Sequence, residues 1–124
     1  MKKGFTLVEI MIVVAIIGII IAIAVPAFLR ARENSRGRAC QENLTKIDGS
    51  KEQYALEKKL GNDDVIAFAD IVDTDGAGTG FLKTEPTCPA DGSNYTISNI
   101  GTDPACTYVA PTWAVQHNLA NISD

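Results

Sequence analysis

A carboxylate within a long apolar run is the first feature of the sequence that could do chemistry. Between Phe5 and Leu29 the only polar or charged side chains are those of Thr6 and Glu9. Such a carboxylate is costly to place in lipid and indicates a function that needs a cationic partner. The run contains no cation, but a cut between Gly4 and Phe5 would create an α-amino group with a pKa of ~8. Alternatively, Glu9 reaches the lipid headgroups and is favoured by the positive end of the helix.

The cysteines are the second group of residues that could do chemistry. Cys40, Cys88 and Cys106 are odd in number, so at most one intramolecular disulfide forms. Cys88 and Cys106 flank a predicted hairpin, and a disulfide between them would close a loop of ~20 residues and stabilise the fold by ~3 kcal/mol. Cys40 then stays a buried, reduced thiol. Alternatively, Cys40 bonds to one of the other two, because the α-carbons need only approach to ~5.5 Å in space.

An acidic loop offers a candidate cation site. The stretch Asp73-Thr74-Asp75-Gly76 begins like a calcium-binding EF-hand loop. The bidentate glutamate that such a loop needs at its twelfth position is missing, because Glu85 comes one residue late. We therefore interpret the stretch as a glycine-rich turn, keep Asp73 and Asp75 as a secondary candidate for a cation, and expect no other metal site.

The remaining polar residues do not form a catalytic set. His117 is the only histidine and lies near the chain end, beside neither a thiol motif nor an acidic pair, so we expect it at the surface. The glycine-rich loop lacks the Lys-Ser or Lys-Thr pair of a phosphate-binding loop. The net charge of −4 does not suggest nucleic-acid binding. The sequence therefore predicts a protein that is not an enzyme, with no catalytic residue, no cofactor and no nucleic-acid partner.

A long N-terminal helix must position most of these residues. The apolar run 5–29 exceeds the ~20 residues that span a bilayer, and no signal-peptidase site follows it. Beyond it, Cys40, Leu44, Ile47 and Tyr54 recur at helical spacing among good helix formers, which predicts an amphipathic continuation over 30–60. Pro26 should bend this helix, and Gly37 and Gly49 should each weaken it by ~1 kcal/mol.

Residues 61–124 are predicted to form a small globular domain. A short helix is expected within 63–71, with Asp63 or Asp64 as its cap. Alternation over 95–98 and 106–109 predicts two strands of a hairpin, and 112–115 a third, edge strand. The fold class is therefore α+β, with the second half of the long helix packed on a small antiparallel sheet.

The first residues also carry a resemblance. The stretch Gly4-Phe5-Thr6-Leu7-Val8-Glu9, followed by an apolar helix, resembles the class III signal of type IV prepilins and type II secretion pseudopilins. The resemblance implies that residues 1–4 are a leader, cleaved after Gly4 by a prepilin peptidase that also N-methylates Phe5. It implies that Glu9, with Thr6 beside it, recognises the new amine of a neighbouring subunit. Gly18 and Pro26 fall at the family's helix-weakening and kinking positions, so the segment between them is expected to lose regular helix in filaments.

The second half of the chain is also similar to small bacterial prepilins. The similarity lies in the run from Leu82 to Tyr95 with Cys88-Pro89, and in the later Pro104-Ala105-Cys106. It implies the lollipop-shaped pilin fold.

The resemblance implies a structural subunit of a type IV pilus filament. Its partners would be copies of itself, the prepilin peptidase, the inner-membrane assembly platform and, before assembly, membrane lipid. The four arginines after the apolar run favour a cytoplasmic domain by the positive-inside rule, but the short basic head before the run favours a cytoplasmic N-terminus. We expect the latter, with a periplasmic domain and then an extracellular pilus. Adhesion, motility and DNA uptake all stay open as roles of that pilus. The alternatives are a pseudopilin of a type II secretion system and a membrane-tethered binding domain that never polymerises.

Overall fold

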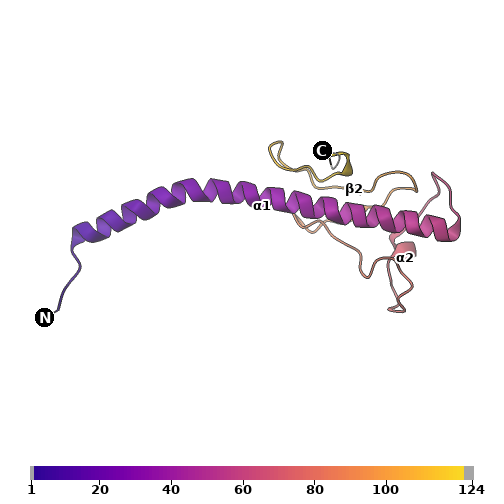
Figure 1. Cartoon of the computed structure of the whole chain (residues 1–124), viewed down its shortest axis with the longest axis horizontal. Coiled ribbons are helices and arrows are strands. Elements are labelled where there is room, and N and C mark those ends of the chain that lie inside the picture. The colour runs from indigo at the N-terminus through magenta and orange to yellow at the C-terminus, as the bar shows by residue number, and fades with distance from the viewer. Residues whose placement is uncertain (1, 122–124) are drawn as a thin grey trace. The chain divides into compact units, whose positions relative to one another are not determined.

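The computed structural model describes residues 2–121, so Met1 of the expected leader and residues 122–124 lie outside the described residues. Along the chain come α1 (Leu7–Lys58), α2 (Phe68–Ile71), β1 (Tyr95–Thr96), β2 (Ala105–Cys106) and the 3₁₀ helix η1 (Leu119–Asn121) (Figure 1). The chain divides into two compact units, Met1–Arg32 and Glu33–Asp124, and α1 contributes residues to both.

The first unit consists mainly of the apolar part of α1. The helix is regular through both Gly18 and Pro26, and every described residue up to Arg32 is exposed. α1 is long and apolar enough to cross a membrane. A helix can do so because its backbone hydrogen bonds are all internal, while its aliphatic side chains face the lipid. The predicted long helix is thus confirmed.

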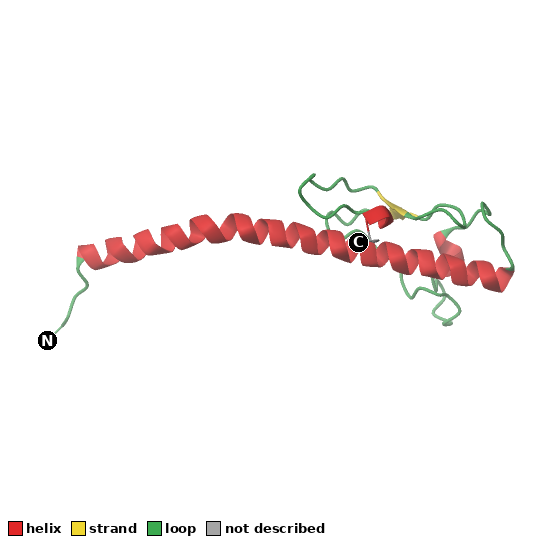
Figure 2. Cartoon of the chain, turned by 45° about the horizontal axis from the view of Figure 1, so that its top comes forward, coloured by secondary structure: helices red, strands yellow, loops and turns green. Residues whose placement is uncertain are grey.

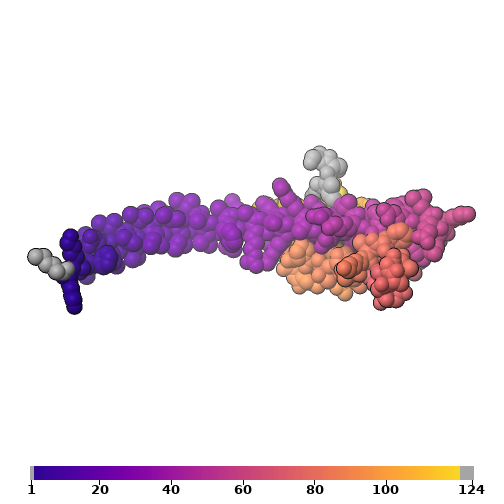
Figure 3. Space-filling view, turned by 60° about the horizontal axis from the view of Figure 1, so that its bottom comes forward, coloured from indigo at the N-terminus to yellow at the C-terminus, as the bar shows by residue number. Residues whose placement is uncertain are grey.

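In the second unit, the remainder of α1 carries the core. Most of the predicted stripe is buried: Cys40, Leu44 and Ile47 are fully inaccessible to solvent, whereas Tyr54 is half-buried and packs against this core. Lys51 continues the stripe and is also fully buried; its Nζ donates a hydrogen bond of 2.5 Å to the carbonyl of Thr102. Burial lowers the pKa of Lys51, because the charged ammonium loses hydration. The space-filling view in Figure 3 shows the orange segments that follow α1 lying along this part of the helix.

The sheet contains two short antiparallel strands. Tyr95 of β1 is opposite Cys106 of β2, and Thr96 is opposite Ala105. Figure 2 shows in yellow how little of the chain is strand. Both strands are shorter than predicted, because only Tyr95–Thr96 and Ala105–Cys106 pair, and the predicted strand residues 97–98 and 107–109 do not. The predicted strand over 112–115 is wrong: this segment is a turn in which the amide of Ala114 donates to the carbonyl of Pro111 at 2.9 Å. The α+β pilin-like fold is nevertheless as predicted.

The short helix begins later than the sequence suggested. The backbone of Asp63 and Asp64 instead pairs with that of Ile100, at 3.0 Å in both directions, which keeps this segment non-helical. α2 starts after Ala67, whose amide donates to the Asp70 carboxylate at 2.8 Å. The predicted caps at Asp63 and Asp64 are therefore wrong.

Candidate functional site

The helix start is organised by a reciprocal pair, Thr6 and Glu9. The backbone amide and the hydroxyl of Thr6 donate to Glu9 Oε2 at 2.8 and 2.9 Å, and the Glu9 amide donates to Thr6 Oγ1 at 3.2 Å. This is a capping box, which satisfies amide groups that the first turn of a helix leaves without partners. The Thr-x-x-Glu spacing is a known signature of such a box, so the sequence contained the signal for it.

The expected cleavage site, between Gly4 and Phe5, is exposed to solvent. Gly4 has no atoms of other parts of the chain around its α-carbon, and the Phe5 side chain is 87% exposed. Both residues precede α1, so the peptide bond between them lies outside the helix. A peptidase could reach this bond without unfolding any helical turn. The cleavage itself stays a prediction, as do the roles of Gly18 and Pro26.

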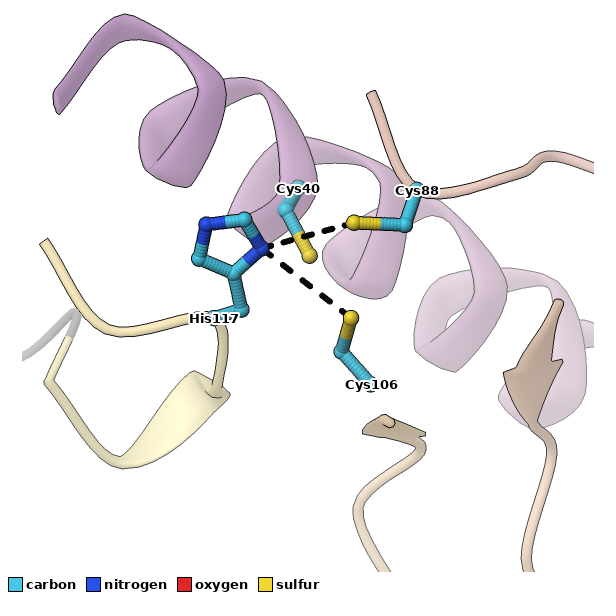
Figure 4. Close-up of side chains that lie close together, drawn as sticks. All are labelled: Cys40, Cys88, Cys106 and His117. Carbon is cyan, nitrogen blue, oxygen red and sulfur yellow. Dashed lines mark hydrogen bonds between the residues drawn. The ribbon is translucent and has the colours of Figure 1, made fainter. Parts of the chain in front are cut away.

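Four side chains converge in the second unit, three of them buried and that of Cys106 half-buried. The sulfurs of Cys40, Cys88 and Cys106 and a ring nitrogen of His117 lie within 4.8 Å of one another (Figure 4). His117 Nδ1 is 3.5 Å from the Cys88 sulfur and 4.0 Å from that of Cys106. All three cysteines are unbonded thiols in this structure. The Cys88–Cys106 disulfide stays a prediction, with both sulfurs in the same cluster.

Separate parts of the fold place these four side chains. Cys40 comes from α1 and Cys106 from β2. Cys88 begins a tight turn in which its carbonyl accepts from the Gly92 amide and its amide donates to the Ser93 carbonyl, both at 2.8 Å. Gly92 has a φ of 77°, a conformation that costs a glycine little.

The segment before His117 is fastened to α1. The amide of Val115 donates to Asn34 Oδ1 at 3.0 Å, and Gln41 donates to the carbonyl of Gln116 at 2.9 Å. Gly37 lies between these contacts, and a side chain there would come within 2.5 Å of the Val115 carbonyl. The small residue at 37 thus lets the segment approach the helix and orient His117.

Burial controls the electrostatics of the cluster. It raises the pKa of Cys40 to about 12 and also raises that of Cys88, because a thiolate loses hydration there. The backbone amides of Ala90 and Asp91 act in the opposite direction and offset part of this rise in the pKa of Cys88. Burial lowers the pKa of His117, which favours the neutral imidazole.

The predicted surface position of His117 is wrong. Its side chain is only 4% exposed, and its ring lies 4.7 Å from that of Tyr108, centroid to centroid. The Tyr108 hydroxyl in turn donates to Glu33 at 2.8 Å. No periodic pattern surrounds His117 in the sequence, so its burial follows only from the return of the chain to α1.

The acidic loop forms a self-contained turn. Asp73 Oδ2 accepts from the Gly78 amide at 2.8 Å, and Asp75 Oδ1 accepts from the Ala77 amide at 3.1 Å. The Asp75 pKa is lowered, mainly by this backbone hydrogen bond. The loop amides thus take up part of the acceptor capacity of both carboxylates, and a cation at Asp73 and Asp75 stays a prediction.

The chain is similar to known proteins, first of all at its N-terminus. The family model described as "Prokaryotic N-terminal methylation motif" matches residues 1–25. A type IV major fimbrial protein of Dichelobacter nodosus is 32% identical over 122 residues, which cover 86% of this chain and 76% of that protein. The type IV major pilin protein of Myxococcus xanthus is 41% identical over 70 residues, covering 55% of this chain and 32% of that pilin.

A relative from a secretion system also matches. The type II secretion system core protein G of Dickeya chrysanthemi is 26% identical over 94 residues, covering 76% of this chain and 54% of that protein. The chain thus spans about a third to a half of the length of the M. xanthus and D. chrysanthemi relatives. No solved structure matches the chain.

These observations define a class of proteins with an N-terminal methylation motif on an apolar helix that leads into an α+β domain. Within that class, the match over most of the D. nodosus fimbrial protein shows that the chain belongs to the type IV pilin family.

Proposed function

We propose that the chain is a structural subunit of a type IV pilus, assembled through the apolar part of α1. The observation that carries this proposal is the first unit itself, where aliphatic side chains between Leu7 and Leu29 are exposed around the helix. Such a surface is stable in lipid, and it is equally stable against other copies in a filament core. A contact that repeats along one axis without closing produces an open filament.

Processing prepares the subunit for assembly. A prepilin peptidase cuts after Gly4, and the new amine of Phe5 is N-methylated, as the motif at residues 1–25 supports. The leader and its positive charges are removed, and an ammonium group remains next to the apolar helix. This group is the cation that the apolar run lacks.

Glu9 then sets the register between subunits. An unpaired carboxylate in an apolar core is penalised, and pairing with the Phe5 amine of a neighbour relieves the penalty. Thr6 lies within hydrogen-bonding distance of the same carboxylate and adds a donor to the pair. Between Gly18 and Pro26 the helix has its weakest residues, and we propose that this segment loosens in the filament.

The chain reaches the filament by way of the membrane. We propose an inner-membrane precursor with a cytoplasmic N-terminus and a periplasmic domain, held by lipid until an assembly platform extracts it. The finished pilus is extracellular. The exposed arginines at 30, 32 and 38 suit the headgroup region before extraction.

Replacing Glu9 with alanine tests the assembly contact. Glu9→Ala should give a processed, membrane-inserted monomer whose filament yield falls ~10-fold or more, because a hydrogen bond to a charged group contributes ~1.5–3 kcal/mol. Filaments are sheared from the cells and quantified against the membrane fraction. Glu57→Ala is the matched control, since it removes an exposed carboxylate from the other end of α1. Normal filaments from Glu9→Ala would refute the role of Glu9.

Mass spectrometry of the sheared fraction tests the function as a whole. A chain that starts at N-methylated Phe5 in sheared filaments supports processing, export and assembly together. An uncut chain starting at Met1 in the membrane would refute the proposal and favour a tethered domain.

A pseudopilin is the second candidate function, favoured by the relative named as a type II secretion core protein. Such a subunit would be processed in the same way but would stay in the cell envelope as a short fibre. Processed protein that is absent from the sheared fraction, together with loss of protein secretion on deletion of the gene, would favour it.

A further inference from the structure

We propose that Cys40, Cys88, Cys106 and His117 bind one Zn²⁺ ion in a closed, tetrahedral site that stabilises the second unit. This inference concerns residues outside the apolar part of α1, and it is independent of the filament function proposed above.

The distances fit the coordination geometry of zinc. With Zn–S bonds of ~2.3 Å and Zn–N bonds of ~2.0–2.1 Å, a tetrahedron holds its ligand atoms ~3.5–3.8 Å apart. His117 Nδ1 lies 3.5 Å from the Cys88 sulfur and 4.0 Å from the Cys106 sulfur. All four ligand atoms lie within 4.8 Å of one another, so each needs to move by less than ~1 Å to close the tetrahedron.

The ligand set is one that zinc selects. Three thiolates and one imidazole are a common combination in structural zinc sites, and soft sulfur ligands disfavour magnesium and calcium. On binding, each of the three thiols releases its proton to solvent, and the neutral imidazole donates the Nδ1 lone pair. Four protein ligands leave no open position for a substrate, so the site is structural.

Burial and local hydrogen bonds also fit a closed site. Cys40 and Cys88 are 0% and 1% exposed, His117 is 4% exposed, and Cys106 is half-buried. The turn that Cys88 begins is closed by two backbone hydrogen bonds of 2.8 Å, so the backbone that carries this ligand is held in place. His117 Nε2 is buried and has no hydrogen-bond partner among residues 2–121. With the metal at Nδ1, the ring proton stays on Nε2 and meets no acceptor there, so the metal bond must offset this loss.

The domain also needs a cross-link. Beyond α1, the described part of the second unit contains only a four-residue helix, two strands of two residues each and a three-residue 3₁₀ helix. So small a domain rarely has enough core to be stable alone, and a structural metal is one common remedy. The ion would join α1, the Cys88 turn, β2 and the segment before η1, which are far apart in the sequence.

A disulfide between Cys88 and Cys106 is the competing state. It would use two of the sulfurs, leave Cys40 and His117 without a role, and exclude the ion. Export into an oxidising compartment favours the disulfide, whereas the convergence of all four ligands favours zinc. The two states differ in mass and in thiol content, so one experiment separates them.

The experiment uses the full chain, purified in detergent from the membrane fraction without added metal or reductant. We expect one zinc per chain by metal analysis and native mass spectrometry, and three cysteines that react with an alkylating agent after denaturation. Replacement of the zinc by Co²⁺ should give the visible absorption of a tetrahedral thiolate site. A chain without zinc, lighter by two hydrogens and with one reactive cysteine, would overturn the proposal.

Variants of His117 separate metal binding from general unfolding. His117→Ala should weaken zinc binding by more than the ~10–100-fold that loss of a supporting residue causes. His117→Cys supplies a fourth thiolate and should retain zinc, with the cobalt absorption shifted toward that of a four-sulfur site. Glu85→Gln, at an exposed carboxylate away from the four ligands, is the control and should leave the zinc content unchanged. Zinc retained in full by His117→Ala would overturn the assignment of this ligand.

Discussion

At the scale of single residues, Glu9 serves two different partners in the life of the chain. In the structure its carboxylate accepts from the amide and the hydroxyl of Thr6. In the proposed filament, it also accepts from the Phe5 amine of a neighbour. A carboxylate oxygen has more than one acceptor site, so the two contacts can coexist. The cap therefore holds Glu9 in a fixed position before the neighbour arrives.

Thr6 can be tested through this cap. Thr6→Ala should loosen the first turn of α1 by ~1 kcal/mol, because the Glu9 amide loses its acceptor and the carboxylate loses a donor. Faster amide hydrogen exchange at residues 7–9, measured on the full chain in detergent, is the expected result. Thr6→Ser keeps the hydroxyl and should exchange as the native chain does. Unchanged exchange in Thr6→Ala would mean that the box contributes nothing to the helix start.

His117 shows where residue-level reading of the sequence fails. The odd number of cysteines and the single histidine were visible, but nothing in their spacing placed them together. The contacts of Asn34 and Gln41 with the chain around His117 decide its position. These are single polar contacts between distant residues, and they leave no periodic trace in the sequence.

At the scale of elements, α1 is the part that the sequence specified best. Its buried stripe repeats with the helical period, so Cys40, Leu44 and Ile47 could be assigned to the core in advance. The strands were found in the right place but too long, because two-residue strands give almost no alternation to detect. The expected third strand is absent from 112–115, where a turn closed by the hydrogen bond from the Ala114 amide to the Pro111 carbonyl takes its place.

Two glycines of α1 that looked equivalent in the sequence should respond in opposite ways. Gly49 has open space around its α-carbon, so Gly49→Ala should stabilise the helix by up to ~1 kcal/mol. At Gly37 the added carbon would meet the Val115 carbonyl at 2.5 Å, and relieving that overlap costs ~1–3 kcal/mol. Gly37→Ala should therefore lower the midpoint of chemical unfolding while Gly49→Ala raises it, with circular dichroism as the readout. A rise in both midpoints would show that the C-terminal segment does not pack on α1 at Gly37.

At the scale of the whole molecule, the two units depend on different physical sources of stability. The helix of the first unit has internal hydrogen bonds and an apolar surface, so lipid, detergent or other subunits stabilise it. The second unit has a small core around α1 and, as proposed, a zinc ion. The apolar run in the sequence indicated how the first unit is stabilised. The proposed zinc site of the second unit could be found only from the positions in space of four side chains that are distant in the sequence.

Zinc removal should therefore affect one unit and spare the other. Because the binding energy of a structural zinc is part of the folding energy, a strong chelator should unfold residues 59–121 of the detergent-solubilised chain. Amide hydrogen exchange should then accelerate across that region, while amides between Leu7 and Arg32 stay protected within the micelle. The Glu85→Gln chain should respond like the native one. His117→Cys should keep its protection at low chelator concentration, because four thiolates hold the zinc. Protection that persists in residues 59–121 after the zinc has left would show that the core around Leu44 and Ile47 suffices for folding.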